Sequence, residues 1–308
     1  MDGLSGLLPV IKPPGMTSFA VIRQVKRILK GVRKVGHGGT LDPEASGVLI
    51  LGLGRATRAL EYCLGLHKTY RAEVIFGLTT DTQDLSGRIV KYQPGSKLEA
   101  ESVVRAAMTL RGEILQVPPM VSAIRYQGRR LYQWAREGAV VPRTARAVVI
   151  YRFDVLDFFC SPFHPRAIIE VECSSGTYVR SLADSLGGVL GCGATLGFLV
   201  RVRVGNLGLG DCFSLEEVLH LAKAGRLQEA LRSPDVFLSN WPVFWVTPEE
   251  EARLIQGQKV FLVRPYSQDK LVPEQYCRIY GPDGKLLGIG WVSPNNEQLA
   301  VQVRKMLR

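Results

Sequence analysis

Periodic apolar positions predict a chain of strands and amphipathic helices. A helix is predicted to begin at residue 17 or 18, because apolar residues then recur at helical spacing up to Leu29, opposite a basic face. Residues 48–53 form an unbroken apolar run, which predicts a buried strand. Runs of branched and aromatic residues predict further strands, at residues 7–11, 68–77, 147–159 and 167–173. Apolar spacing predicts further helices, at residues 98–110 and 215–224.

The C-terminal part of the chain has a different pattern. A helix start at Pro248 is followed by short alternating segments and glycine-containing turns up to residue 292. Short strands joined by turns are typical of a small β-barrel. We therefore expect a larger α/β domain at residues 1–240 and a smaller β-rich domain at residues 241–308.

Composition narrows the class of protein. The chain has 39 Lys and Arg against 28 Asp and Glu, a net charge of +11, which gives weak support for a polyanionic partner. The six cysteines and four histidines have no zinc-ligand spacing, so we expect no metal site. No uninterrupted apolar stretch reaches the length of a membrane span, which predicts a soluble, cytoplasmic protein without membrane contact.

One loop carries candidate chemistry. Residues 36–47 read GHGGTLDPEASG, so a single carboxylate, Asp42, lies between glycines and directly before Pro43. Glycines allow positive φ angles, and a proline restricts the residue before it, so the carboxylate is held on a stiff loop. An Asp-Pro pair by itself is more often an ordinary turn.

A basic segment later in the chain also has alternative interpretations. Residues 122–146 interleave arginines with aromatic side chains, a pattern that suits phosphate contacts and base stacking on folded RNA. Leu131, Trp134 and Ala135 could equally bury one side of a helix. The basic face of the helix that begins near residue 17 is likewise either a solvated surface or an RNA contact.

The loop at residues 36–47 resembles the signature loop of the bacterial tRNA pseudouridine-55 synthases, the TruB family. The resemblance implies that Asp42 is the catalytic residue and favours a His37 that occupies the space left by an extruded base. The alternative is that His37 forms a hydrogen bond within the loop. Similar motifs at residues 68–70, 79–84, 174–184 and 197–201 imply the roles of four further residues. Tyr70 would stack on the target uracil, Arg180 would face the catalytic carboxylate, and Tyr178 and Leu199 would line the uracil pocket.

The resemblance also implies the fold and the reaction. It predicts an α/β (α+β) catalytic domain, with a mixed, mostly antiparallel central sheet flanked by helices, and a C-terminal PUA-like β-barrel. Uridine 55 in the T-loop of tRNA would be flipped out and isomerised to pseudouridine without a cofactor or a metal. The basic segment 122–146 would clasp the RNA, and the enzyme would act as a monomer without an obligate protein partner.

Three other functions are compatible with parts of the pattern. The related archaeal and eukaryotic class carries a similar loop but depends on guide RNA and partner proteins. An RNA-binding or tRNA-folding protein would need no active carboxylate, yet Asp42, Tyr70 and Arg180 are all present. A glycosidase would need a second acid, and Glu44 is poorly suited because Pro43 separates it from Asp42.

Overall fold

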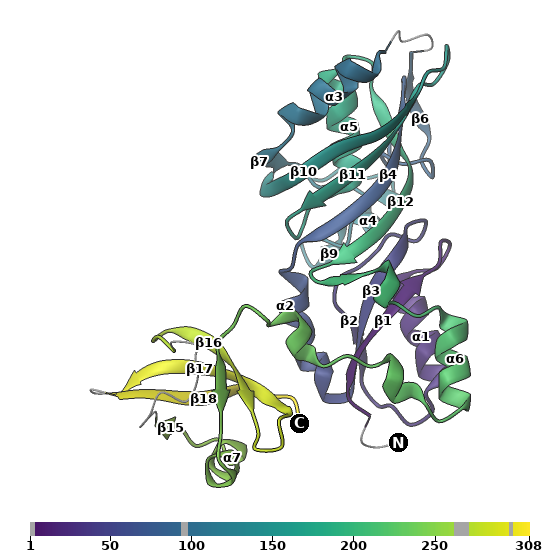
Figure 1. Cartoon of the computed structure of the whole chain (residues 1–308). Helices are drawn as coiled ribbons and strands as arrows, with labels where there is room; N and C mark the ends of the chain where they lie inside the picture. Colours follow the sequence, from purple (N-terminus) through teal and green to yellow (C-terminus); the bar gives the residue numbers. More distant parts are fainter. Residues whose placement is uncertain (1–3, 94–97, 262–270, 296–297) are drawn as a thin grey trace. The chain divides into compact units, whose positions relative to one another are not determined.

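The chain forms two compact units in this computed structural model (Figure 1). The structure describes residues 4–93, 98–261, 271–295 and 298–308. The first unit comprises Met1–Pro43, Val48–Leu64 and Gly205–Arg308, and the second comprises Glu44–Gly47 and Gly65–Val204.

Five neighbouring strands of a larger sheet organise the second unit. These strands, in spatial order, are β12 (Ala194–Val204), β4 (Lys68–Phe76), β11 (Arg166–Cys173), β10 (Arg146–Phe159) and β7 (Gly112–Gln116). All neighbours in this order are antiparallel. Ser46 and Gly47, at the start of β3, pair in parallel with β12. The predicted mixed, mostly antiparallel sheet is therefore confirmed.

Helices cover one face of this sheet. Helices α3 (Ala100–Thr109) and α5 (Val179–Val189) contribute buried residues to the same hydrophobic cluster as β4, β10, β11 and β12. Alternate residues of β4, among them Ala72, Val74 and Phe76, are fully buried in this cluster. Because side chains alternate along a strand, the residues between them lie on the other face. That face is charged.

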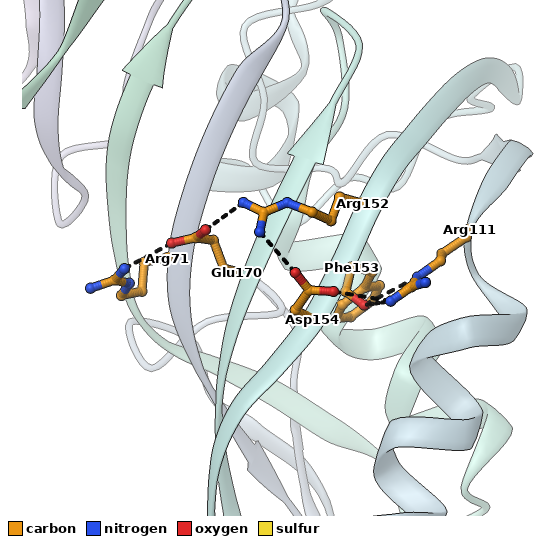
Figure 2. A network of polar contacts seen from close by, with 6 residues as sticks. All are labelled: Arg71, Arg111, Arg152, Phe153, Asp154 and Glu170. Carbon is orange, nitrogen blue, oxygen red and sulfur yellow. Dashed lines mark hydrogen bonds and ion pairs between the residues drawn. The ribbon is translucent and has the colours of Figure 1, made fainter.

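The charged face carries a continuous row of ion pairs, which we call the arginine ladder (Figure 2). Glu170 on β11 accepts from Arg71 on β4 at 2.8 Å and from Arg152 on β10 at 2.5 Å. Arg152 also pairs with Asp154 at 2.9 Å, and Asp154 pairs with Arg111 at 3.0 Å. Glu170 thus lies between arginines of β4 and β10, whereas Asp154 lies between Arg152 of its own strand and Arg111, the residue directly before β7.

The first unit begins with β1 (Gly6–Lys12) and α1 (Ser18–Ile28), followed by β2 (Val35–His37) and most of β3 (Ser46–Leu53). The hydroxyl of Thr17 caps α1 by accepting from the backbone N–H of Ala20. The apolar face of α1 packs in one cluster with β1, β3 and α6 (Leu215–Lys223). The predicted helix and the predicted buried strand are both confirmed.

The C-terminal part of the first unit contains α7 (Pro248–Ile255) and a curled five-stranded sheet, half of a barrel (Figure 1). Its strands, in spatial order, are β14 (Val243–Trp245), β16 (Gln275–Tyr280), β17 (Leu286–Asn295), β18 (Gln298–Met306) and β15 (Val260–Phe261). One of the short alternating segments expected from the sequence covers residues 260–263, and of these residues 262 and 263 lie outside the described residues.

Short elements connect the larger ones. In the second unit these are β5 (Leu78–Thr80), β6 (Ile89–Tyr92), β8 (Arg125–Tyr126), β9 (Arg129–Arg130) and α4 (Leu131–Arg136). In the first unit they are η1 (Gly54–Ala59), α2 (Leu60–Leu64), β13 (Leu207–Gly208), η2 (Leu209–Asp211), η3 (Leu227–Ala230) and η4 (Pro234–Phe237). None of the helices in the described part of the chain has the length and apolar character needed to cross a membrane.

Candidate active site

The backbone on both sides of Asp42 is held by side chains from the start of the chain. The hydroxyl of Ser18 accepts from the N–H of Leu41 at 2.9 Å and donates to the carbonyl of Leu41 at 3.2 Å. Lys12 is fully buried, and its ammonium donates to the carbonyls of Pro13 and Pro43, each at 2.8 Å. A buried cation has lost its water, so these carbonyl contacts are needed to hold it there. Asp42, between the two anchored residues, is half-buried.

Glycines are required at two positions of the loop. A Cβ on Gly38 would lie 2.5 Å from the sulfur of Cys63, so no larger residue fits there without a shift. Gly47 has φ of +105°, and a Cβ there would lie 2.2 Å from the carbonyl oxygen of Arg201 on β12. Next to Gly38, the ring Nδ1 of the half-buried His37 accepts from the N–H of Gly39 at 3.4 Å.

Two predicted pocket residues lie on adjacent strands of the second unit. Tyr70 on β4 is half-buried and pairs in register with Arg201 on β12. Leu199 on β12 is also half-buried and pairs with Ala72 on β4. Both side chains pack against the hydrophobic cluster beneath the sheet. Packing on two paired strands gives these side chains a rigid support.

Tyr178 is held through its backbone. The side chain of Gln116, at the end of β7, accepts from the N–H of Tyr178 at 2.7 Å and donates to its carbonyl at 3.0 Å. Gln116 is 6% exposed, so this paired amide contact is shielded from water. Tyr178 is the N-cap residue of α5, and the contact therefore fixes where the helix begins.

Arg180, in the first turn of α5, is buried and surrounded by acceptors. Its guanidinium donates to the carbonyls of Val121 at 2.8 Å and Thr82 at 3.1 Å. Its Nε lies 3.6 Å from the carboxylate of Asp84, whose other oxygen accepts from the hydroxyl of Thr82 at 2.7 Å. With a side chain only 3% exposed, Arg180 is fixed in one direction.

A second set of hydrogen bonds connects α5 to the segment that contains Thr82 and Asp84. The hydroxyl of Ser181 donates to Gln83 at 2.8 Å, and the amide of Gln83 donates to Asp184 at 3.0 Å. Burial raises the pKa of Asp184 above its ordinary value, and the hydrogen bond from Gln83 opposes that rise. Gln83 has φ of +64°, an uncommon angle for a residue other than glycine, which these contacts support.

The six predicted site residues fall into two groups. Tyr70, Tyr178, Arg180 and Leu199 belong to the second unit, whereas His37 and Asp42 belong to the first. The pairing of Arg180 with Asp42 stays a prediction. Four residues that hold the site were missed: Lys12, Ser18, Asp84 and Gln116. Asp84 ends the motif at residues 79–84, so its place in that motif was the available signal.

The basic segment at residues 122–146 is partly packed, as one of the two interpretations of its sequence expected, and its contact with RNA stays a prediction. Strands β8 and β9 form a hairpin, and α4 follows with Leu131 buried. The guanidinium of Arg129 lies over the ring of Trp134, 4.4 Å from its centroid. Arg125 and Arg130 are exposed. One side of the segment is therefore packed, while Arg125 and Arg130 face solvent.

Comparison with solved structures identifies proteins that share this fold. A chain in the structure of an H/ACA RNP bound to a substrate RNA containing 2'-deoxyuridine has the same fold, with a TM-score of 0.73 at 22% identity. The match covers 98% of this chain and 85% of that one. A Cbf5-Nop10-Gar1 complex gives the same TM-score at 23% identity, with the same coverage. The chain therefore shares its fold with a chain in each of these two structures.

Sequence matches identify the family. Residues 26–179 match the TruB family pseudouridylate synthase N-terminal domain, and residues 242–302 match the pseudouridine synthase II TruB C-terminal domain. The chain belongs to the TruB family of pseudouridine synthases. A protein of Moorella thermoacetica named tRNA pseudouridine synthase B is 42% identical over 94% of each chain. A protein of the same name from Pelotomaculum thermopropionicum is 41% identical over 92% of this chain and 90% of its own.

Proposed function

We propose that this protein is a tRNA pseudouridine synthase that isomerises uridine 55 in the T-loop of tRNA. In this reaction the C1′–N1 bond breaks, a C1′–C5 bond forms, N1 gains a proton and C5 loses one. The atoms of the product are those of the substrate, so the reaction uses no oxidant, reductant or co-substrate. The family membership and the relatives named tRNA pseudouridine synthase B support this activity.

Asp42 supplies the carboxylate on which the isomerisation depends. The observation that carries this assignment is that hydrogen bonds hold the backbone around Asp42. Ser18 holds the residue before Asp42, and Lys12 holds the residue after it. A carboxylate held in one direction acts on the nucleotide, as a nucleophile or as a base, with little loss of conformational entropy. Arg180 is proposed to face this carboxylate, the role that its motif at residues 174–184 implies.

The remaining site residues bind the extruded base or fill the space that it leaves. Tyr70 stacks on the uracil and keeps it in the pocket while it rotates, and Tyr178 and Leu199 close the pocket around it. His37 fills the space that the extruded base leaves in the T-loop of the tRNA. This contact offsets part of the few kcal/mol that unstacking the base costs. These roles rest on the motifs that carry the residues and on their support by paired strands and by the N-terminus of α5.

The test uses the purified protein and an unmodified tRNA transcript with nothing else added. We expect pseudouridine at position 55, and we expect Asp42→Asn to lower its rate of formation by at least about 1,000-fold with tRNA affinity nearly unchanged. Glu44→Gln is the matched control, since it removes an exposed carboxylate from the same loop and should retain turnover. Full activity of Asp42→Asn would remove Asp42 from its proposed role.

The same assay separates the alternatives. Pseudouridine that forms only when guide RNA and partner proteins are supplied would favour the guide-dependent class, whereas we propose an enzyme that works alone in the cytoplasm. Release of free uracil would favour a glycosidase. Tight tRNA binding without any change to the nucleotide would favour an RNA-binding protein.

A further inference from the structure

The N-terminal segment has an unusual distribution of charge. Residues 3–41 contain no Asp or Glu, although the whole chain has 28 of them in 308 residues. Six cations gather on the outward side of α1 and on the residues directly after it. We call this set the basic helix face: Arg23, Lys26, Arg27, Lys30, Arg33 and Lys34, all exposed.

The positive charges of the basic helix face are not paired with carboxylates among the described residues. None of its six cations forms an ion pair with any residue that the structure describes. Arg23 lies three residues from Lys26 and four from Arg27, so the three side chains are neighbours on the helix. Like charges at these spacings repel and destabilise a helix. The attraction of a helix C-terminus for cations explains Lys26 and Arg27 in the last turn, but it does not explain Arg23 or the residues beyond Ile28.

The face begins at the candidate active loop. Ser18, the first residue of α1, is hydrogen-bonded to Leu41, next to Asp42. At a rise of about 1.5 Å per residue, Arg23 and Arg27 lie roughly 8 and 14 Å along the helix from Ser18. The longer of these distances spans several nucleotide steps of an RNA strand that runs away from the protein loop at residues 36–47. Phe19, 63% exposed and covered by the guanidinium of Arg23 at 5.6 Å, adds an aromatic contact at the near end.

We propose that the basic helix face binds backbone phosphates of the tRNA stem that adjoins the target loop. The inference rests on the proposed function and specifies where the substrate is held. Exposed lysines and arginines without carboxylate partners can neutralise phosphates directly and release the counterions around the RNA. Contacts of this kind position a nucleic acid and do not read its sequence.

The test variant carries Arg23→Gln, Arg27→Gln and Lys30→Gln. Its matched control carries Arg71→Gln, Arg105→Gln and Arg166→Gln, which remove the same amount of charge from exposed arginines that each pair with a carboxylate. We measure binding of an unmodified tRNA transcript against salt concentration, pseudouridine formation at saturating tRNA, and thermal unfolding. Glutamine is a good helix former, so both variants should fold.

We expect the test variant to bind tRNA about 10- to 100-fold more weakly at 0.1 M salt, with a slope of log K against log salt smaller by about two to three. Turnover at saturating tRNA should be unchanged, and Tm in the absence of RNA should be unchanged or higher. The control variant should keep the wild-type affinity and slope. Equal affinities for the test variant and the wild type, or equal losses in both variants, would overturn the proposal. A wild-type protein that forms no pseudouridine would instead overturn the proposed function.

Discussion

Two arginine-rich surfaces of this protein differ in what the arginines contact. In the arginine ladder, Arg71 and Arg152 share the carboxylate of Glu170, which is only 14% exposed. On the basic helix face, Arg23 and Arg27 have no carboxylate partner among the described residues. The first arrangement satisfies its charges inside the protein, whereas the second leaves them for another molecule.

The difference shows that the number of arginines on a surface does not by itself indicate a nucleic-acid contact. Charges that are paired across strands add to the stability of the sheet and leave little net potential outside it. Unpaired charges of one sign lower stability and raise the potential. A net charge of +11 is therefore less informative than the positions at which carboxylates are absent.

The largest effect on stability should come from breaking the ladder at its centre. Glu170→Gln removes the negative charge shared by Arg71 and Arg152 and replaces one of its two acceptor oxygens by an NH2 donor. The two arginines are 51% and 46% exposed and so recover part of their hydration. We expect a loss of about 1–2 kcal/mol, after that allowance for solvent screening. The loss should appear as a Tm lower by about 2–8 °C, with tRNA affinity unchanged. A variant as stable as the wild type would show that the ladder contributes nothing.

Acid should weaken the ladder in a predictable pH range. Hydrogen bonds from Arg71 and then Arg152 hold the pKa of Glu170 below its ordinary value of 4.5, against the effect of burial. A lowered pKa in the folded state gives stability that is complete above pH 4.5 and lost as pH falls through the folded-state pKa. Denaturant unfolding at several pH values should show the gap between wild type and Glu170→Gln narrowing by about 1 kcal/mol between pH 7 and pH 3.5. A constant gap would contradict this prediction.

Sequence periodicity predicted most elements whose apolar pattern is regular. The helix at Ser18–Ile28 and the strand at Ser46–Leu53 follow from their apolar spacing. Strand β12, central to the sheet order, was missed because Gly197 and the arginines at its end interrupt any apolar run. Its place comes from pairing with β3 and β4, a long-range effect that local spacing does not contain.

The candidate site was predictable only as far as its motifs reach. Asp42 was recognisable from the glycine-bounded loop and Arg180 from the segment at residues 174–184. Lys12 was missed, because nothing in the sequence relates it to Pro43, 31 residues away. Gln116 was missed for the same reason, since it contacts Tyr178 across 62 residues. Contacts between the site and residues far away in the sequence can be identified only from the folded structure.

The smallest effect should come from converting the unpaired surface into a paired one. Arg23→Glu places a carboxylate three and four residues before Lys26 and Arg27, the favourable order for ion pairs on a helix. Two repulsive contacts become attractive, so we expect unfolding to cost about 0.5–1 kcal/mol more at low salt, and the gain should disappear at high salt. The matched reversal is Arg105→Glu on α3, where Arg105 pairs with Glu101 at 3.5 Å and a loss of stability is expected. Stability that falls in both variants would mean that the cations of α1 are compensated within the protein. Stability that rises only for Arg23→Glu, together with weaker tRNA binding, would show that the cations of this surface lower the stability of the protein and raise its affinity for tRNA.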